Sequence, residues 1–365
     1  MDAKLSPDQG LNLTGIGLVS ILSVGLATTA MVLDGMANRL PWQSMSLTLP
    51  LLLCAVVSAA VGYWVVPMLR ALKAGQIIRE DGPQAHLKKG GTPTMGGIFF
   101  VPTAVFMACI LSSFDTKVLA VAALTLSYGL IGWLDDWQIL RRKSNKGISP
   151  RMKLALQVGF AAMFCLWLVF TQSINITNIA LPLGLSLPLG WLLFLPLAGF
   201  VLVAESNATN LTDGVDGLAA GTVAIALLTL GALVAPLAPG LMIFCAALSG
   251  GCVGFLVHNR NPARVFMGDT GSLALGGALG GVALLSNSLF ALFILSGIFF
   301  VETLSVMAQV SYYKATKGPD GKGKRLFKMA PLHHHLELSG WSELQVVSIF
   351  YVIAAMLAVI TMAIR

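Results

Sequence analysis

Several short polar motifs interrupt a strongly apolar chain, and their residue types suit phosphate and metal chemistry. Asp135 and Asp136 stand in G-W-L-D-D-W, where a long apolar run ends. Mg²⁺ prefers such hard carboxylate oxygens and usually takes one or two of them together with phosphate oxygens. Adjacent helical residues point about 100° apart, so one aspartate can face a ligand while the other faces elsewhere. A solvated charge pair at a helix end is the plainer interpretation of an isolated D-D.

A second motif, N-A-T-N-L-T-D-G-V-D-G, covers residues 207–217. Asp213 and Asp216 are three residues apart, so one helical turn would place both on one side. Asparagine, aspartate and glycine also suit tight turns. A capped turn accounts for Asn207 and the glycines, but it explains two aspartates beside a membrane less well.

A third motif, H-N-R-N-P-A-R-V-F-M-G-D-T-G, covers residues 258–271 and precedes a serine and an apolar run. Gly268, Gly271 and Ser272 would let backbone N–H groups approach an anion at a helix start. Asp269 could hold Mg²⁺ against that anion, and Phe266 offers a flat surface for a base. The motif is not a Walker A loop, because no G-K-S/T closes it.

Three consecutive histidines, His333, His334 and His335, lie in the largest polar loop. Neighbours on a chain rarely all face one ion, so imidazole donors near phosphate are the more plausible role. The lysines around them are equally well explained by attraction to anionic lipids.

Glu302 is the one acid that we place clearly inside an apolar run. Ser305 and Gln309 follow it on the same helix face. A polar stripe inside a membrane must point into the protein, so we expect a structural hydrogen-bond network there rather than a catalytic role.

The elements that carry these motifs are predicted to be membrane helices. The chain is 56% hydrophobic and only 11% charged, whereas soluble domains are about 25% charged. A spanning helix needs about 20 mostly apolar residues. The candidate spans are Gly15–Leu33, Leu49–Met68, Gly96–Ser113, Val118–Leu134, Leu154–Phe170, Trp191–Ala204, Leu218–Val234, Leu241–Val257, Leu273–Leu285, Leu289–Val310 and Leu344–Ile364. The sequence therefore predicts an all-α integral membrane protein. The first run could instead be a signal peptide, but it lacks a basic n-region and is long for an h-region, so we expect a retained helix.

Charge placement orients these spans. Alternate loops hold 19 of the 23 lysines and arginines, and basic loops stay on the cytoplasmic side. These loops cover residues 70–91, 135–153, 207–217, 258–272 and 312–343. The same loops hold all five histidines and most acids, so the polar site is predicted to be cytoplasmic. A transporter would be expected to place ionisable groups near the midplane.

Five motifs together resemble the polyprenyl-phosphate N-acetylhexosamine-1-phosphate transferase superfamily. They are G-T-P-T-M-G-G (91–97), L-D-D (134–136), N-L-T-D-G-V-D-G-L (210–218), V-F-M-G-D-T-G-S-L-A-L-G (265–276) and A-P-L-H-H-H-L-E (330–337). The resemblance runs from about Leu49 to the C-terminus. The triple histidine with P-T-M-G-G favours the muramoyl-pentapeptide branch over the sister branch that uses UDP-GlcNAc.

The resemblance implies a ten-helix transferase core over residues 49–365, with cytoplasmic active-site loops, in a bacterial plasma (inner) membrane. Residues 1–48 then form an N-terminal extension with an additional transmembrane helix. The implied donor is UDP-MurNAc-pentapeptide, the acceptor is undecaprenyl phosphate, and the cofactor is Mg²⁺. Membrane lipid surrounds the chain, nucleic acid is not expected, and a homodimer stays open.

The resemblance also implies site residues. The matches to catalytic positions are Asp135, Asp136, Asp269 and His333, with Asp269 as the Mg²⁺ ligand. The matches to substrate-binding positions are Lys89, Thr94, Lys153, Asn210, Asp213, Asp216, Asn259, Phe266, Gly268, Ser272, Gln309, His334 and His335.

Two mechanisms remain open at this point. The lipid phosphate attacks the donor's β-phosphate directly, or an aspartate first forms a covalent phosphosugar intermediate. A lipid transporter is the alternative from a different functional class.

Overall fold

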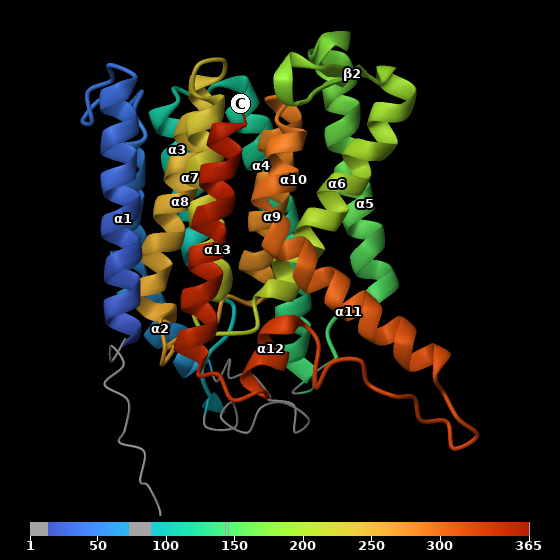
Figure 1. Cartoon of the computed structure of the whole chain (residues 1–365). Helices are drawn as coiled ribbons and strands as arrows, with labels where there is room; N and C mark the ends of the chain where they lie inside the picture. The colour runs from blue at the N-terminus through green and yellow to red at the C-terminus, as the bar shows by residue number, and fades with distance from the viewer. Residues whose placement is uncertain (1–13, 73–88, 143, 145, 365) are drawn as a thin grey trace, which may run out of the picture.

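The computed structural model describes residues 14–72, 89–142, 144 and 146–364, and these are almost entirely helical (Figure 1). Of the basic loop predicted over residues 70–91, residues 73–88 lie outside the described residues. The helices are α1 (Gly15–Met36), α2 (Thr48–Ala71), α3 (Gly97–Leu111), α4 (Thr116–Arg142), α5 (Pro150–Thr171), α6 (Gly190–Thr212), α7 (Leu218–Val234), α8 (Pro239–Asn259), α9 (Gly268–Leu285), α10 (Leu289–Leu295), α11 (Gly297–Ala315), α12 (Leu332–Glu337) and α13 (Glu343–Ala363).

The prediction of an all-α integral membrane protein is confirmed. Seven of the described helices are long and apolar enough to cross a membrane, and α10 with α11 would make an eighth if the bent pair is one span. Two shorter apolar helices, α3 and α7, stand among them. Each predicted apolar run thus coincides with a helix or, in one case, with a helix pair.

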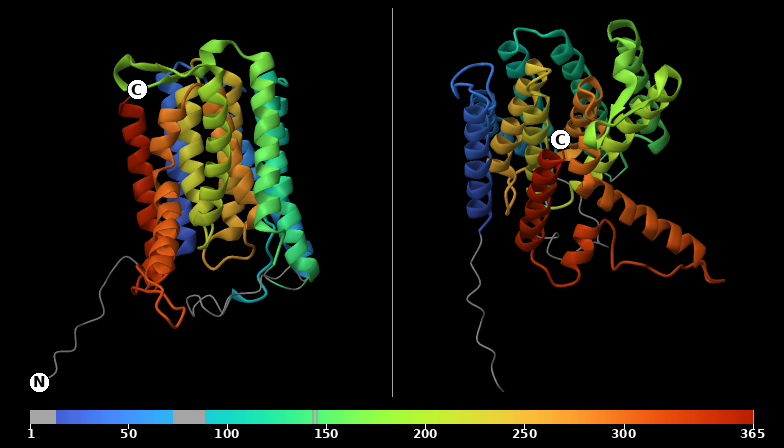
Figure 2. Two further views of the ribbon diagram at one scale, coloured as in Figure 1. Left: turned by 90° about the vertical axis from the view of Figure 1, so that its right-hand side faces the viewer. Right: turned by 45° about the horizontal axis from the view of Figure 1, so that its top comes forward.

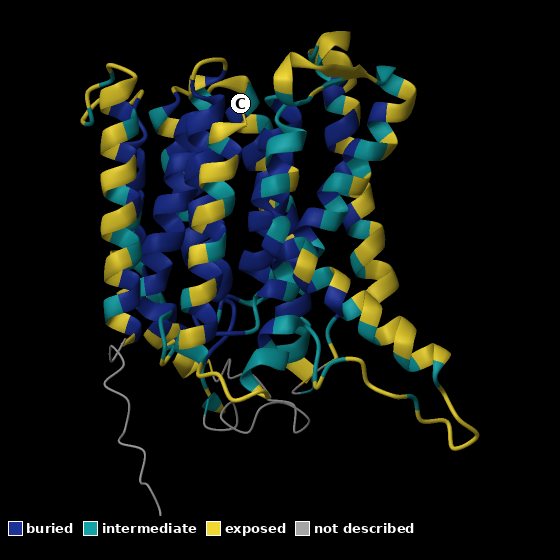
Figure 3. Cartoon of the chain, viewed as in Figure 1, coloured by how far each residue is buried: buried dark blue, intermediate teal, exposed yellow. Residues whose placement is uncertain are grey.

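The core consists of helices that are apolar on all sides. Every residue of α7 is buried, and so is nearly all of α8 and α9, which is the pattern of a helix enclosed by others. Figure 3 shows this buried centre inside more exposed outer helices. Glycines allow α9 to pack closely, since a Cβ on Gly276 would lie 2.4 Å from Cα of Ser206.

Two helices extend beyond their apolar runs toward the polar site. α4 continues to Arg142, so Asp135 and Asp136 lie within a helix and not at its end. α6 continues to Thr212, so Asn207 and Asn210 are helical rather than part of a turn. Polar residues near the membrane boundary therefore prolong these helices, because their side chains find partners inside the protein.

The predicted span Leu289–Val310 is broken. α10 and α11 meet at Ser296 with a bend of 67°, and α11 slopes away from the bundle in Figure 1 and in the right-hand view of Figure 2. Adjacent serine and glycine residues are a common site of helix kinks. Here the hydroxyl of Ser296 donates to Oε1 of Glu205 at 2.7 Å, which fixes the break against α6.

The two ends of the bundle differ. At one end, β1 (Asn178–Ala180) pairs antiparallel with β2 (Ser186–Pro188). The short helix η2 (Ile174–Thr177) precedes β1, and η3 (Pro182–Gly184) lies between the two strands. This short hairpin connects α5 to α6. The end of α13 lies on that side, and α12 lies at the opposite end, where the motif loops gather (Figure 1).

The N-terminal helix α1 packs against α2, α7 and α8. Its buried residue Asp34 binds the start of α2: its carboxylate accepts from the N–H groups of Leu47 and Thr48 at 3.0 and 2.9 Å. The Thr48 hydroxyl donates at 2.7 Å and Arg39 Nε at 2.9 Å. Asp34 therefore joins α1 to α2 at the end opposite to the motifs.

Candidate active site

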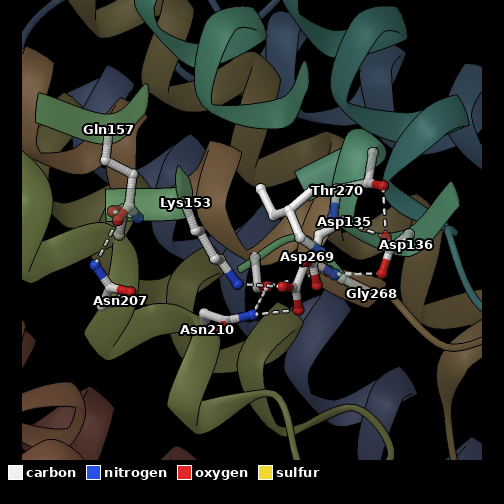
Figure 4. A network of polar contacts seen from close by, with 12 residues as sticks. Asp135, Asp136, Lys153, Gln157, Asn207, Asn210, Gly268, Asp269 and Thr270 are labelled. Carbon is white, nitrogen blue, oxygen red and sulfur yellow. Dashed lines mark hydrogen bonds and ion pairs between the residues drawn. The ribbon is translucent and has the colours of Figure 1, made fainter. Parts of the chain in front are cut away.

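Asp269 lies at the centre of the motif-bearing loops, in the first turn of α9. Its side chain is 23% exposed. One carboxylate oxygen pairs with Nζ of Lys153 from α5, and the other accepts from Nδ2 of Asn210 on α6 at 2.8 Å (Figure 4). Asn210 Nδ2 also lies 2.8 Å from the Ser272 hydroxyl. Four predicted residues thus meet, carried by three helices.

The two adjacent aspartates of α4 face different partners, as the sequence suggested. Asp136 accepts from the N–H and hydroxyl of Thr270 at 3.0 and 2.6 Å, and from the N–H of Asp269 at 3.3 Å. It therefore caps the start of α9, a contact that typically stabilises a helix by about 1 kcal/mol. Asp135 accepts from the N–H of Ile148 at 2.8 Å and lies beside the Asp269 carboxylate.

Asp213 joins this group from the end of α6. It follows the last residue of the helix and accepts a hydrogen bond from the backbone of Gly268. Burial, followed by the negative charges of Asp269, Asp136 and Asp216, raises the pKa of Asp213 to about 8. Its proton thus partly relieves the concentration of negative charge.

We call Asp135, Asp136, Asp213 and Asp269 the carboxylate cluster. The one cation bound to it among the described residues is Lys153, so negative charge remains uncompensated. Its donors are hard oxygens, which fit Mg²⁺, an ion that takes one or two carboxylates and completes its shell with water and phosphate. Among the described residues, no group of three or more His, Cys, Asp or Glu side chains is arranged to hold a metal ion.

A second ionic group lies beside the carboxylate cluster. Asp216 pairs with Lys89 at 2.8 Å and accepts from the N–H of Ala263 at 3.0 Å. Lys89 also pairs with Glu343 at 2.7 Å, and Asn261 Nδ2 donates to Glu343. Burial raises the pKa of Asp216, and Lys89 opposes that rise. We call Lys89, Asp216, Asn261 and Glu343 the Lys89 group.

The prediction that Asp213 and Asp216 share one side of a helical turn is wrong. α6 ends at Thr212, and the chain turns before Gly217, which has a φ of +84°. Asp213 consequently faces the start of α9, whereas Asp216 faces Lys89. The glycines open the helix at this point and separate the two carboxylates.

Asn259 has a structural position. Its Oδ1 accepts from the N–H of Gly217 at 2.9 Å, and its Nδ2 donates to the carbonyl of Val265 at 2.9 Å. The side chain is buried. Asn259 therefore clamps two motif loops together, and both of its polar groups are directed at backbone rather than at an open site.

Position 268 requires glycine, because neighbouring side chains lie too close to leave room for a Cβ atom. Its φ is +72°, and a Cβ there would lie 2.5 Å from Oδ2 of Asp136 and 2.9 Å from the hydroxyl of Thr94. Phe266 precedes it, and its backbone carbonyl accepts from the N–H of Gly96 at 2.8 Å. The P-T-M-G-G segment is thus bound along the loop that leads into Asp269.

The three histidines face three directions. Buried His333 donates from its N–H to Glu302, and its Nδ1 lies 3.1 Å from the Glu302 carboxylate. Its Nε2 has no hydrogen-bond partner within the described part of the chain and faces the turn after α6. His334 contacts Glu337 at 2.8 Å, and His335 Nδ1 accepts from the N–H of Lys328 at 3.1 Å. Glu302 is therefore part of a buried hydrogen-bond network, and its partner His333 is one of the predicted catalytic residues.

Gln309 lies apart from the carboxylate cluster. Its Oε1 accepts from the N–H groups of Leu326 and Phe327 at 2.9 and 2.8 Å, and its Nε2 donates to the Phe327 carbonyl at 3.2 Å. The side chain fastens the loop after α11 to that helix. The described structure thus shows a loop clamp at this predicted substrate-binding position.

Comparisons with known proteins identify the family. Residues 118–287 match the family model described as Glycosyl transferase family 4. The Nostoc punctiforme protein named phospho-N-acetylmuramoyl-pentapeptide-transferase is 82% identical, with 100% of each chain covered. A protein of the same name from Rippkaea orientalis is 64% identical over 99% of each chain. The chain belongs to the phospho-N-acetylmuramoyl-pentapeptide-transferase family. This confirms the family predicted from the five motifs and does not favour the sister branch.

The sequence similarity to these relatives extends into the N-terminal segment before Leu49. The Acaryochloris marina relative is 58% identical over 98% of this chain and 95% of its own. The similarity therefore continues through α1, beyond the segment from Leu49 onward that carries the motifs.

Sequence reasoning missed two polar residues that support the site. Gln157 lies one turn after Lys153; its Nε2 donates to the Ser206 hydroxyl at 2.9 Å, and its Oε1 accepts from Asn207 at 3.1 Å (Figure 4). These bonds fix α5 against α6 where both helices reach Asp269. A lone glutamine four residues after a lysine in an apolar run was the available signal.

Glu205 was also missed, and the statement that Glu302 is the one acid inside an apolar run is wrong. Glu205 is buried in α6 and accepts from Ser296 at the α10–α11 break. The predicted run stopped one residue short of it, at Ala204, and so placed it in the polar flank.

Proposed function

We propose that this chain transfers phospho-MurNAc-pentapeptide from UDP-MurNAc-pentapeptide to undecaprenyl phosphate. The products are undecaprenyl-diphospho-MurNAc-pentapeptide and UMP, and the carboxylate cluster faces the cytoplasm of a bacterial plasma membrane. The observation that carries the proposal is Asp269 in the first turn of α9, next to Lys153, in a chain closely similar to proteins of this name.

The donor set of the cluster supports Mg²⁺ as the cofactor. Asp269 would hold the ion, with water and substrate phosphate completing its coordination shell. When bound, Mg²⁺ supplies positive charge that allows two anionic phosphates to approach. Asp136 is less suited to bind the ion, because its oxygens already accept from the start of α9.

The residues of the chain supply binding and orientation. Lys153 offsets phosphate charge, and Asn210 and Ser272 hold Asp269 in place. The N-terminus of α9 favours an anion in front of it. The Lys89 group borders the same loops, where it would orient the nucleotide end of the donor. These contacts position both phosphates without a covalent step on the protein.

The chemical step is a direct displacement. An oxygen of the lipid phosphate forms a bond to the donor's β-phosphorus, and the bond from that phosphorus to the UMP oxygen breaks, so UMP leaves with the electron pair. The second pKa of a phosphate monoester is about 6, so the acceptor is mostly dianionic at neutral pH and needs no strong base. Asp135 would orient the acceptor or accept a residual proton.

A reconstituted assay tests the function. Purified chain in detergent is given UDP-MurNAc-pentapeptide, undecaprenyl phosphate and Mg²⁺, and release of UMP is measured. We expect UMP and lipid-linked product in equal amounts. Turnover with UDP-GlcNAc but not with the muramoyl donor would contradict the assignment. Radiolabelled sugar-phosphate trapped on the protein without acceptor would contradict the direct displacement.

A further inference from the structure

The helix α1 lies outside the segment that carries the family motifs, at the edge of the bundle (Figure 1). Much of it faces the membrane: Ile21 and Val24 are 65% and 66% exposed. A membrane anchor needs no more than such an apolar surface. Both ends of α1 are nevertheless attached to the rest of the protein. Asp34 joins one end to α2, and the first residue, Gly15, is buried against a motif loop.

Gly15 meets that loop at its backbone. A Cβ added to Gly15 would lie 2.0 Å from the carbonyl oxygen of Asn261 and 3.1 Å from its nitrogen. Real Cβ atoms do not approach other atoms so closely, so no other residue fits without moving α1 or the loop. The N–H of Gly17 donates to Oγ1 of Thr14 at 3.1 Å, and this cap fixes where the helix begins.

Asn261 links this contact to two other members of the Lys89 group, Glu343 and Asp216. Its Nδ2 donates to Glu343 and lies 3.3 Å from Oδ2 of Asp216. Two residues on, the N–H of Ala263 donates to the same Asp216 oxygen at 3.0 Å. Displacement of the loop at Asn261 therefore moves the donors that hold Asp216 against Lys89.

We propose that α1 is a positioning element of the active site, with Gly15 as its contact residue. It braces the backbone of Asn261, so that Asn261 and Ala263 hold Asp216 in register with Lys89 and Glu343. The inference rests on the proposed function, because its effect is read in the binding of the nucleotide-sugar donor. It assigns the N-terminal extension a role at the site in addition to its place in the membrane.

Gly25 gives a matched control on the same helix. No atom of another residue lies within 4 Å of a Cβ built there, so Gly25→Ala changes the same residue type at a membrane-facing position. On an exposed helix, glycine to alanine normally stabilises by up to about 1 kcal/mol. A helix that served as an anchor alone would accept both substitutions equally.

The experiment compares Gly15→Ala, Gly25→Ala and wild type in the UMP-release assay, with KM measured separately for donor and acceptor. Small misplacements at a distance can cost up to about 100-fold in rate. We expect Gly15→Ala to lower kcat/KM for the donor by about 10- to 100-fold through a raised donor KM. The acceptor KM should stay unchanged, and Gly25→Ala should stay within about twofold of wild type.

A second variant keeps the inference testable if Gly15→Ala folds poorly. Asn261→Ala leaves α1 and its backbone contact intact but removes the link to Glu343 and Asp216, so it should also raise the donor KM. Equal donor KM values for Gly15→Ala and Gly25→Ala, or an unchanged donor KM in Asn261→Ala, would overturn the inference. Absence of UMP release by wild type would instead contradict the proposed function.

Discussion

Buried carboxylates occur at both ends of the bundle, and they differ in how completely their charge is matched. Asp34 is fully buried, yet it accepts from two backbone N–H groups, a hydroxyl and Arg39. The carboxylate cluster at the other end brings four aspartates together around one lysine. Asp269, its central member, is partly exposed.

The difference separates a structural acid from a site acid. A buried charge is tolerated when its hydrogen bonds and counter-charge are complete, and Asp34 meets that condition inside the protein. The carboxylate cluster lacks complete counter-charge inside the protein. Binding a cation or a proton from solution would therefore lower its free energy. Burial alone would not have distinguished the two regions.

The largest expected effect is on turnover. Asp269→Asn keeps the size of the side chain and its place in α9 but removes the charge that faces the substrates. We expect kcat to fall by about 10³-fold or more, while the protein still inserts and keeps its melting temperature. UMP release and a thermal melt on the same preparation check this. Wild-type turnover in this variant would remove Asp269 from the reaction.

At the other end of the bundle, substitution of Asp34 is expected to lower stability and to leave turnover nearly unchanged. Asp34→Asn sets an amide beside the N–H groups of Leu47 and Thr48 and leaves Arg39 without its partner. Stability should fall by about 2 kcal/mol, measured by denaturant unfolding in detergent. The kcat of the surviving folded protein should stay within about twofold. A loss of kcat comparable with that of Asp269→Asn would erase the contrast between the two regions.

The smallest effect concerns pH. The pKa of Asp213 is raised from 3.8 to about 8, so the folded state binds this proton more tightly than the unfolded chain. In the absence of a cation, stability should therefore fall as pH rises from about 4 to about 8. A bound cation favours the charged carboxylate, so Mg²⁺ should raise the melting temperature more at pH 8.5 than at pH 6.5. In Asp213→Asn that pH dependence should weaken.

An equal Mg²⁺-induced shift at both pH values in wild type would contradict this reading of Asp213. Asn207→Ala is a matched control on the same helix end, since its bonds run to Gln157 and to a backbone carbonyl. Its response to Mg²⁺ should keep the pH dependence of wild type.

The sequence predicted the helices well, because hydropathy is a property of contiguous residues. It failed where partners distant in the chain decide the outcome. The bend at Ser296 depends on Glu205, ninety-one residues away in sequence. The course of α4 past Asp136 depends on the start of α9, which that aspartate caps.

The candidate site shows the same division. Motif spacing brought Asp135, Asp136 and Asp269 to attention, and the structure places them together. Residue type alone could not distinguish side chains that contact substrate from side chains that hold the surrounding loops. Asn259 and Gln309 fit a substrate-binding pattern, yet their side chains bind backbone. Such roles depend on which loops meet, and a pattern of residue types does not encode that.

The most direct test of the contrast is cation binding itself. Mn²⁺, as a spectroscopic substitute for Mg²⁺, would be titrated into detergent-solubilised wild type, Asp269→Asn and Asp34→Asn, with bound ion measured by electron paramagnetic resonance. Wild type and Asp34→Asn should bind Mn²⁺ with similar affinity, and Asp269→Asn should lose at least about tenfold in affinity. Wild-type affinity in Asp269→Asn would contradict the assignment of the carboxylate cluster as the metal site.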